Sequence, residues 1–172
     1  MLEMVVIVTL IVPFCLALAA ISDLFTMKIP NKLSAAILVS FLVFAPLVGL
    51  GWADYGMSIA AASAVFAVCF MLFVMNVMGG GDAKLLTATA IWFGFTPALI
   101  SFLVTVAFVG GFITLIFLLL RANANTAMAM GIRLPASLVT ESKIPYGIAI
   151  AIGGYLTFQQ SPVVNLVLLA AS

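Results

Sequence analysis

Histidine is absent from the sequence, which removes the commonest general base and the commonest metal ligand in proteins. A Ser-His-Asp triad is therefore impossible, and a cysteine nucleophile would lack its usual partner base. Only two cysteines occur, Cys15 and Cys69; both lie inside apolar runs, and no CxxC spacing is found. We therefore expect buried thiols rather than a disulfide framework or a zinc site, and we expect no metal and no cofactor.

Charge is also scarce, since 6% of the 172 residues are charged while 66% are hydrophobic. A soluble domain of this size could not bury so much apolar surface, so the solvent for most of the chain must be the lipid bilayer. The net charge of +1 gives no reason to expect a nucleic-acid partner. Composition therefore predicts an all-α, polytopic membrane protein, because a spanning helix satisfies its own backbone groups.

Apolar runs interrupted by short polar segments predict about six transmembrane helices in a single domain over residues 1–172, since a crossing needs about 20 apolar residues. The predicted spans are 4–21, 33–50, 57–78, 82–93, 98–120 and 144–158. The fourth is short because the segment 94–97 breaks a longer apolar run, and it fits only if its N-terminal end lies in a protein-lined recess. The tail 163–171 is too short to cross, and either lies along the interface or packs on the bundle.

Two glycine pairs, Gly110-Gly111 and Gly153-Gly154, fall inside predicted spans. Small residues at such positions let neighbouring helices approach closely, and we expect that role here.

The distribution of basic residues predicts the orientation in the membrane. With six spans and the N-terminus outside, every basic residue falls in a cytoplasmic loop, as the positive-inside rule requires. The outer segments carry Glu3 and Asp54 instead. Because Glu3 opens the first segment and no Lys or Arg precedes it, a permanent helix is expected rather than a cleaved signal peptide. The basic residues are Lys28, Lys32, Lys84, Arg121, Arg133 and Lys143.

Two aspartates stand at the ends of hydrophobic segments. Asp23 follows one crossing and Asp82 follows three, so both are predicted at the cytoplasmic side of the membrane. An ionisable group at membrane depth is costly and is a functional candidate by default. Asp82 completes the GxGD pattern of residues 79–82, in which three glycines permit unusual backbone angles and close approach of another segment. The ordinary alternatives are an interfacial carboxylate for Asp23 and a helix N-cap for Asp82.

Two carboxyl groups that can meet are the minimum equipment of an aspartyl protease. One stays protonated and polarises the scissile carbonyl, while its ionised partner takes a proton from the attacking water. Two such groups in close contact titrate as a unit, because both cannot ionise cheaply. This chemistry needs no histidine, metal or cofactor.

Three segments carry a family resemblance. Their order and spacing resemble the prepilin peptidases, the GxGD-type membrane aspartyl proteases of type IV pilus and type II secretion systems, over essentially the whole chain. The segments are Ser22-Asp23 with Ile29-Pro30-Asn31, Gly79 to Lys84, and Lys143 to Gly147. The resemblance implies that Asp23 and Asp82 are the catalytic pair.

The same resemblance implies that Gly79, Gly81 and the C-terminal signature Lys143, Pro145 and Tyr146 lie near the site. Taken by themselves, a proline in a first helical turn and an interfacial tyrosine are ordinary structural features. Lys84 can likewise form a surface pair, anchor its helix at headgroup level or contact the substrate, and anchoring is its ordinary role.

The chain departs from the larger members of that family. Those carry an N-terminal cytoplasmic region with paired CxxC motifs and also methylate the new N-terminus. Here the first loop has about ten residues and no CxxC exists, so we expect no N-methyltransferase activity. The compact form is similar to the peptidases that serve Flp pili of the Tad system, with archaeal preflagellin peptidases as the alternative. Presenilin-like proteases share GxGD, but their YD and PAL motifs are missing.

The resemblance also implies the partners and the location. The expected substrates are prepilins or pseudopilins with a basic leader and an apolar helix, cut at the cytoplasmic boundary of the inner (plasma) membrane. Two rivals from other classes use the same residues differently. A proton-coupled transporter or channel would carry the aspartates in its path, whereas a non-catalytic scaffold of a secretion machine would tolerate their neutral replacement.

Overall fold

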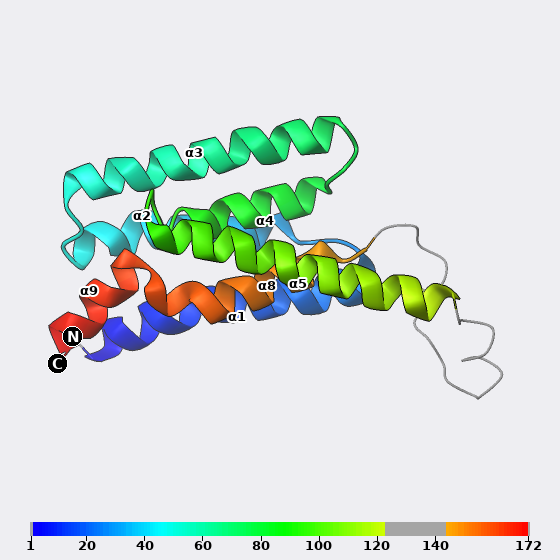
Figure 1. Ribbon diagram of the computed structural model, residues 1–172. Coiled ribbons are helices and arrows are strands. Elements are labelled where there is room, and N and C mark those ends of the chain that lie inside the picture. Colours follow the sequence, from blue (N-terminus) through cyan, green and yellow to red (C-terminus); the bar gives the residue numbers. More distant parts are fainter. Residues whose placement is uncertain (1, 123–143, 172) are drawn as a thin grey trace.

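The computed structural model describes residues 2–122 and 144–171, and every regular element within these ranges is helical. The expected all-α class is thus confirmed for the described part of the chain. The helices form an elongated bundle, with both chain termini at the same end (Figure 1). The elements are α1 (Leu2–Thr26), α2 (Asn31–Leu47), α3 (Trp52–Val74), α4 (Gly80–Ala90), α5 (Pro97–Ala122), α8 (Tyr146–Thr157), the 3-10 turn η1 (Phe158–Gln160) and α9 (Pro162–Ala171).

Helix α1 is longer than the sequence predicted, and this changes the setting of Asp23. The polar stretch predicted over 22–32 is reduced to 27–30, because the helix continues to Thr26. Two hydroxyl groups satisfy carbonyls at this end: Thr26 donates to the Ser22 carbonyl at 2.7 Å, and Ser22 donates to the Lys28 carbonyl at 2.8 Å. Asp23 therefore lies within a helix and not in a loop.

Among the described helices, three are long and apolar enough to cross a membrane. These candidate spans are Val6–Thr26, Trp52–Val74 and Pro97–Ala122. With 17, 11 and 12 residues, α2, α4 and α8 are shorter than the roughly 20 residues of a full crossing. The count of six crossings and the outer N-terminus stay predictions, and the loop predicted over 121–142 lies, from residue 123 on, outside the described residues.

Of the short helices, α4 and α8 occupy the middle of the bundle. Helix α8 packs between α1 and α5, and α4 packs against α2, α3 and α8 (Figure 1). Six of the eleven residues of α4 and seven of the twelve of α8 are buried. In contrast, at most 33% of the most apolar window of each candidate span is buried. The candidate spans thus leave most of their side chains exposed, as lipid-facing helices would, while α4 and α8 are largely covered by protein.

Three of the four paired glycines create the close contacts around α8. A Cβ at Gly153 would lie 2.5 Å from a methyl group of Val106 and 3.1 Å from its backbone nitrogen. Gly154 meets Leu16 of α1 in the same way, and Gly110 of α5 meets the Tyr146 ring. The expectation of close helix packing is confirmed at these positions. It is wrong for Gly111, which faces open space.

The end of the bundle that holds the chain termini is fixed by hydrogen bonds to Trp92. The Trp92 indole donates to the Ile37 carbonyl at 3.2 Å, and the Ser161 hydroxyl donates to the Trp92 carbonyl at 2.6 Å. Ser161 directly precedes α9, whose residues Val163 and Val164 are each 1% exposed. Of the two placements left open for the tail, the structure therefore has it packed on the bundle.

We expect Gly153→Ala to destabilise the protein, because the added methyl group meets the backbone of α5. Overpacking of this kind typically costs about 1–3 kcal/mol. Gly111→Ala is the matched control, since that position is open and alanine favours helix. Thermal unfolding in detergent should show a lower midpoint for Gly153→Ala only; equal midpoints would contradict the close α5–α8 contact.

Candidate active site

Asp23 is a buried carboxyl group held by the start of another helix. Its side chain is 5% exposed, and its Oδ2 atom accepts a hydrogen bond from the backbone N–H of Gly147 at 2.8 Å. Gly147 is the second residue of α8, so the free N–H groups of that helix point toward the carboxyl group. A helix N-terminus also carries partial positive charge and favours a negative group beside it. Asp23 is thus buried with a specific polar partner.

The absence of a side chain at Gly147 makes this contact possible. A Cβ there would lie 2.8 Å from Asp23 Oδ2 and 3.0 Å from Asp23 Cβ, which is too close for either pair. Pro145 is the N-cap of α8 and is buried. Tyr146 opens the helix and packs on Gly110 of α5. Lys143, predicted from the same motif, lies outside the described residues.

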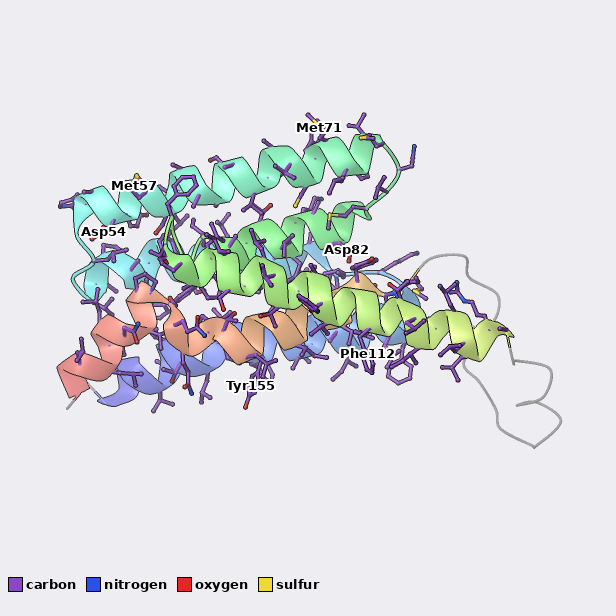
Figure 2. All side chains as sticks on the ribbon, in the orientation of Figure 1. Asp54, Met57, Met71, Asp82, Phe112 and Tyr155 are labelled. Carbon is purple, nitrogen blue, oxygen red and sulfur yellow. The ribbon has the colours of Figure 1, made fainter. Side chains whose placement is uncertain are left out.

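Asp82 lies in the first turn of α4, at one end of the bundle. Its side chain is half-buried and folds back over Gly79, where its Oδ2 atom lies 2.7 Å from the position of a Cβ. Figure 2 shows Asp82 and Asp54 at opposite ends of the part formed by α3 and α4. The N-cap of α4 is Gly79, so Asp82 is not the N-cap that the ordinary alternative supposed. A carboxylate in the first turn is favoured by the helix dipole.

The glycines before Asp82 provide space and not unusual backbone angles. Gly79 has φ −71° and ψ 143°, which any residue adopts, and positive φ among the described glycines occurs only at Gly49 and Gly94. The expectation of special backbone angles is therefore wrong. Each glycine instead contacts a different side chain: Asp82 covers Gly79, the Phe73 ring lies 3.2 Å from a Cβ at Gly80, and Ile29 lies 3.2 Å from one at Gly81.

Ile29 connects the two aspartate-bearing regions. Its Cβ contacts Gly81, the neighbour of Asp82, while its Cδ1 lies 3.0 Å from the Cβ position of Gly147, the partner of Asp23. The two regions thus lie on either side of one isoleucine side chain, although 59 positions separate the aspartates in the chain. Ile29 belongs to the Ile29-Pro30-Asn31 segment that carries part of the family resemblance. No sequence pattern predicted that it contacts both Gly81 and Gly147.

Lys84 has a specific partner in the structure. Its ammonium group donates a hydrogen bond to Asn31 Oδ1 at 3.1 Å, and so connects the second turn of α4 to the first residue of α2. Both side chains are exposed at the Asp82 end of the bundle. Lys84 therefore helps to position α4 next to the 27–30 segment.

The arrangement can perform acid–base chemistry with carboxyl groups alone. Among the described residues no group of three or more His, Cys, Asp or Glu side chains could hold a metal ion. A buried carboxyl and a half-buried one at neighbouring helix ends have the composition of an acid–base pair. The fold and the site together are those of a helical protein with three candidate membrane spans and with two aspartates at neighbouring helix ends.

The comparison with family models identifies the chain more closely. The model of the type IV leader peptidase family matches residues 10–119, more than half of the chain, and the matched segment contains both aspartates. The chain belongs to the type IV leader peptidase family, which confirms the prepilin peptidase resemblance and brings with it aspartic-type peptidase activity at the level of the family. Searches of curated proteins and of solved structures gave no match.

We expect Gly147→Ala to lower leader-peptide cleavage strongly. The added methyl group would displace the Asp23 carboxyl group, and a misplacement of about 1 Å costs on the order of 100-fold in rate. Gly56→Ala is the control, because a Cβ at Gly56 has no neighbour within 4 Å. Initial rates with a purified prepilin measure the effect. An unchanged rate for Gly147→Ala would show that the site does not depend on this contact.

Proposed function

We propose that the protein is an aspartic endopeptidase that removes the basic leader from type IV prepilins, with Asp23 and Asp82 as its catalytic pair. The observation that carries the proposal is the double contact of Ile29, which lies against Gly81 beside Asp82 and against Gly147, the partner of Asp23. Segments from three parts of the chain thereby converge at one end of the bundle. A site made of two carboxyl groups needs this convergence.

The reaction requires only these two groups and water. The protonated carboxyl donates a hydrogen bond to the scissile carbonyl, while the ionised partner removes a proton from water. The water oxygen bonds to the carbonyl carbon and forms a tetrahedral intermediate. This intermediate collapses when the peptide C–N bond breaks and the leaving amine takes a proton from a carboxyl group. The pair then regains its starting protonation, with one proton shared between two acids.

The proposed orientation puts this site at the cytoplasmic face of the inner membrane. The chain then crosses six times from an outer N-terminus as a single domain, 1–172. The exposed lysines Lys28, Lys32 and Lys84 lie on segments at the site end, as the positive-inside rule expects of the cytoplasmic side. The N-terminal end of short α4, which such a crossing needs in a protein-lined recess, is half-buried at residues 80–82. The segment that follows the helix is buried, since Ile91, Trp92 and Phe93 are each at most 2% exposed.

The proposed substrates are Flp-type prepilins of the Tad system, and the proposed activity is peptidase without N-methylation. The loop after α1 spans only 27–30, and the chain has no CxxC motif. These are the features in which the compact peptidases differ from the larger bifunctional ones. Offering a Flp-type prepilin and an archaeal preflagellin to the same purified protein distinguishes the two compact types.

Asp23→Asn and Asp82→Asn should each reduce cleavage of a co-expressed Flp-type prepilin by at least about 100-fold, because each removes one partner of the acid–base pair. Asn keeps the size of the side chain, so both variants should still accumulate in the membrane. Asp54→Asn, in the first turn of α3 at the other end, is the control and should cleave normally. A gel shift of the prepilin reports the result. Full activity in either Asp23→Asn or Asp82→Asn would falsify the assignment.

The topology makes a separate prediction for thiol labelling of intact cells. In Asp54→Cys and Lys84→Cys variants, a membrane-impermeant maleimide should label position 54 from outside and position 84 only after the cells are opened. Both positions are exposed, and the native Cys15 and Cys69 are buried, so the background should be low. Labelling of both positions from the same side would contradict the six-span orientation.

A further inference from the structure

The connector between α1 and α2, residues 27–30, has a defined backbone conformation. Met27 has φ 52°, in the left-handed region, and Asn76 is the only other non-glycine residue with positive φ in the described part of the chain. Ile29 precedes a proline, which favours extended backbone at that position. Pro30, with φ −61° and ψ 127°, is the N-cap of α2. The four residues therefore form a specific turn.

The Ser22 hydroxyl binds the middle of this connector. It donates to the Lys28 carbonyl at 2.8 Å, and so reaches past the end of α1 to a residue six positions later. Thr26 Oγ1 lies 3.3 Å from the same carbonyl, but its single hydrogen is donated to the Ser22 carbonyl at 2.7 Å. Ser22 is thus the main side-chain donor to the Lys28 carbonyl.

The backbone of Met27 shows that this turn forms against a conformational preference. A left-handed backbone is unfavourable for residues other than glycine, and it persists only where surrounding contacts fix it. Here the Met27 N–H donates to the Asp23 carbonyl at 2.9 Å, and the Ser22 hydroxyl binds the next residue of the connector. Both contacts start from the last turns of α1. The turn is thus fixed relative to Asp23, one of the two candidate catalytic residues.

The turn places the Ile29 side chain between the starts of two helices. Its Cβ lies 3.2 Å from the position of a Cβ at Gly81, and its Cδ1 lies 3.0 Å from the position of one at Gly147. One part of the side chain therefore contacts the start of α4, which carries Asp82, and another part contacts the start of α8, which binds Asp23. Because packed side chains compress little, the position of Ile29 determines how closely these two helix starts approach.

We propose that Ser22 is a positioning residue of the peptidase; the inference rests on the proposed function. Its hydroxyl fixes the connector, the connector places Ile29, and Ile29 sets the separation of Asp23 and Asp82. The role is indirect, because the Ser22 hydroxyl binds a backbone carbonyl of the connector. Two carboxyl groups that share one proton and act on one water molecule depend on their spacing, so a looser connector lowers the rate of the chemical step.

A comparison of Ser22→Val with Ser22→Thr isolates the hydroxyl group, because valine and threonine have nearly the same shape. For a purified Flp-type prepilin, Ser22→Val should lower kcat by about tenfold and leave KM unchanged, as expected for a lost hydrogen bond that affects only the chemical step. Ser22→Thr should retain the wild-type kcat. Ser63→Val is the matched control, because the Ser63 hydroxyl donates at the same 2.8 Å but to the Ile59 carbonyl of its own helix. Equal kcat values for Ser22→Val and Ser22→Thr would overturn the proposal.

A double-mutant cycle tests whether Ser22 acts through Ile29. Ile29→Ala removes the atoms that contact Gly147 and should lower kcat by itself. In the Ile29→Ala background, Ser22→Val should change kcat little further, because the side chain that the connector positions is already missing. A general loss of stability would instead give independent effects. Losses that multiply in the double variant would therefore show that Ser22 does not act through Ile29.

Amide hydrogen exchange provides a readout that needs no cleavage. Peptides that contain the Gly147 N–H, bonded to Asp23, and the Ala83 N–H, bonded to the Gly79 carbonyl, should exchange faster in Ser22→Val than in Ser22→Thr. Peptides from α3 should exchange alike in both. Equal exchange at both helix starts would overturn the positioning role whether or not the protein cleaves. If exchange differs as expected but wild-type protein cleaves no prepilin, the proposed function fails and the peptidase role of Ser22 fails with it.

Discussion

The hydrogen bond between the Gly147 backbone and Asp23 is the constraint from which the rest of the site follows. A carboxyl group that is 5% exposed needs a partner, because an unsatisfied buried polar group is costly. The partner here is a helix N-terminus, so the start of α8 must meet the last turns of α1. Only glycine permits that approach, since a Cβ at position 147 would overlap the carboxyl group.

The packing of the bundle brings α8 close enough to α1 for the Gly147–Asp23 hydrogen bond. Short α8 lies between α1 and α5, and glycines at 110, 153 and 154 remove the side chains that would hold these helices apart. Glycines have the same effect at the start of α4. There, the absence of three side chains lets Asp82, Phe73 and Ile29 pack against the backbone. Small residues therefore bring two short central helices close to their neighbours, and the longer outer helices carry most of the lipid-facing surface.

Much of this could be predicted from composition and spacing. The scarcity of charge gave the helical membrane class, and the positions of Asp23 and Asp82 relative to the apolar runs put both at the same end. The end of α1 was predicted too early, because the hydroxyl groups of Ser22 and Thr26 support the helix through a polar stretch that periodicity alone treats as loop.

Other features depend on tertiary contacts that no local pattern contains. Gly111 has the same sequence context as Gly110, yet only Gly110 faces another helix. Ile29 is an ordinary apolar residue in sequence, and its place between Gly81 and Gly147 arises from the meeting of α1, α4 and α8.

The central claim is that Asp23 and Asp82 share one site, and a thiol cross-link tests it most directly. In a variant without Cys15 and Cys69, cysteines at positions 23 and 82 should be joined in membranes by a short bifunctional reagent, as mass spectrometry of the digested protein would show. The pair 23 and 54 is the control and should not be joined. A folded protein in which positions 23 and 82 fail to cross-link would contradict the account.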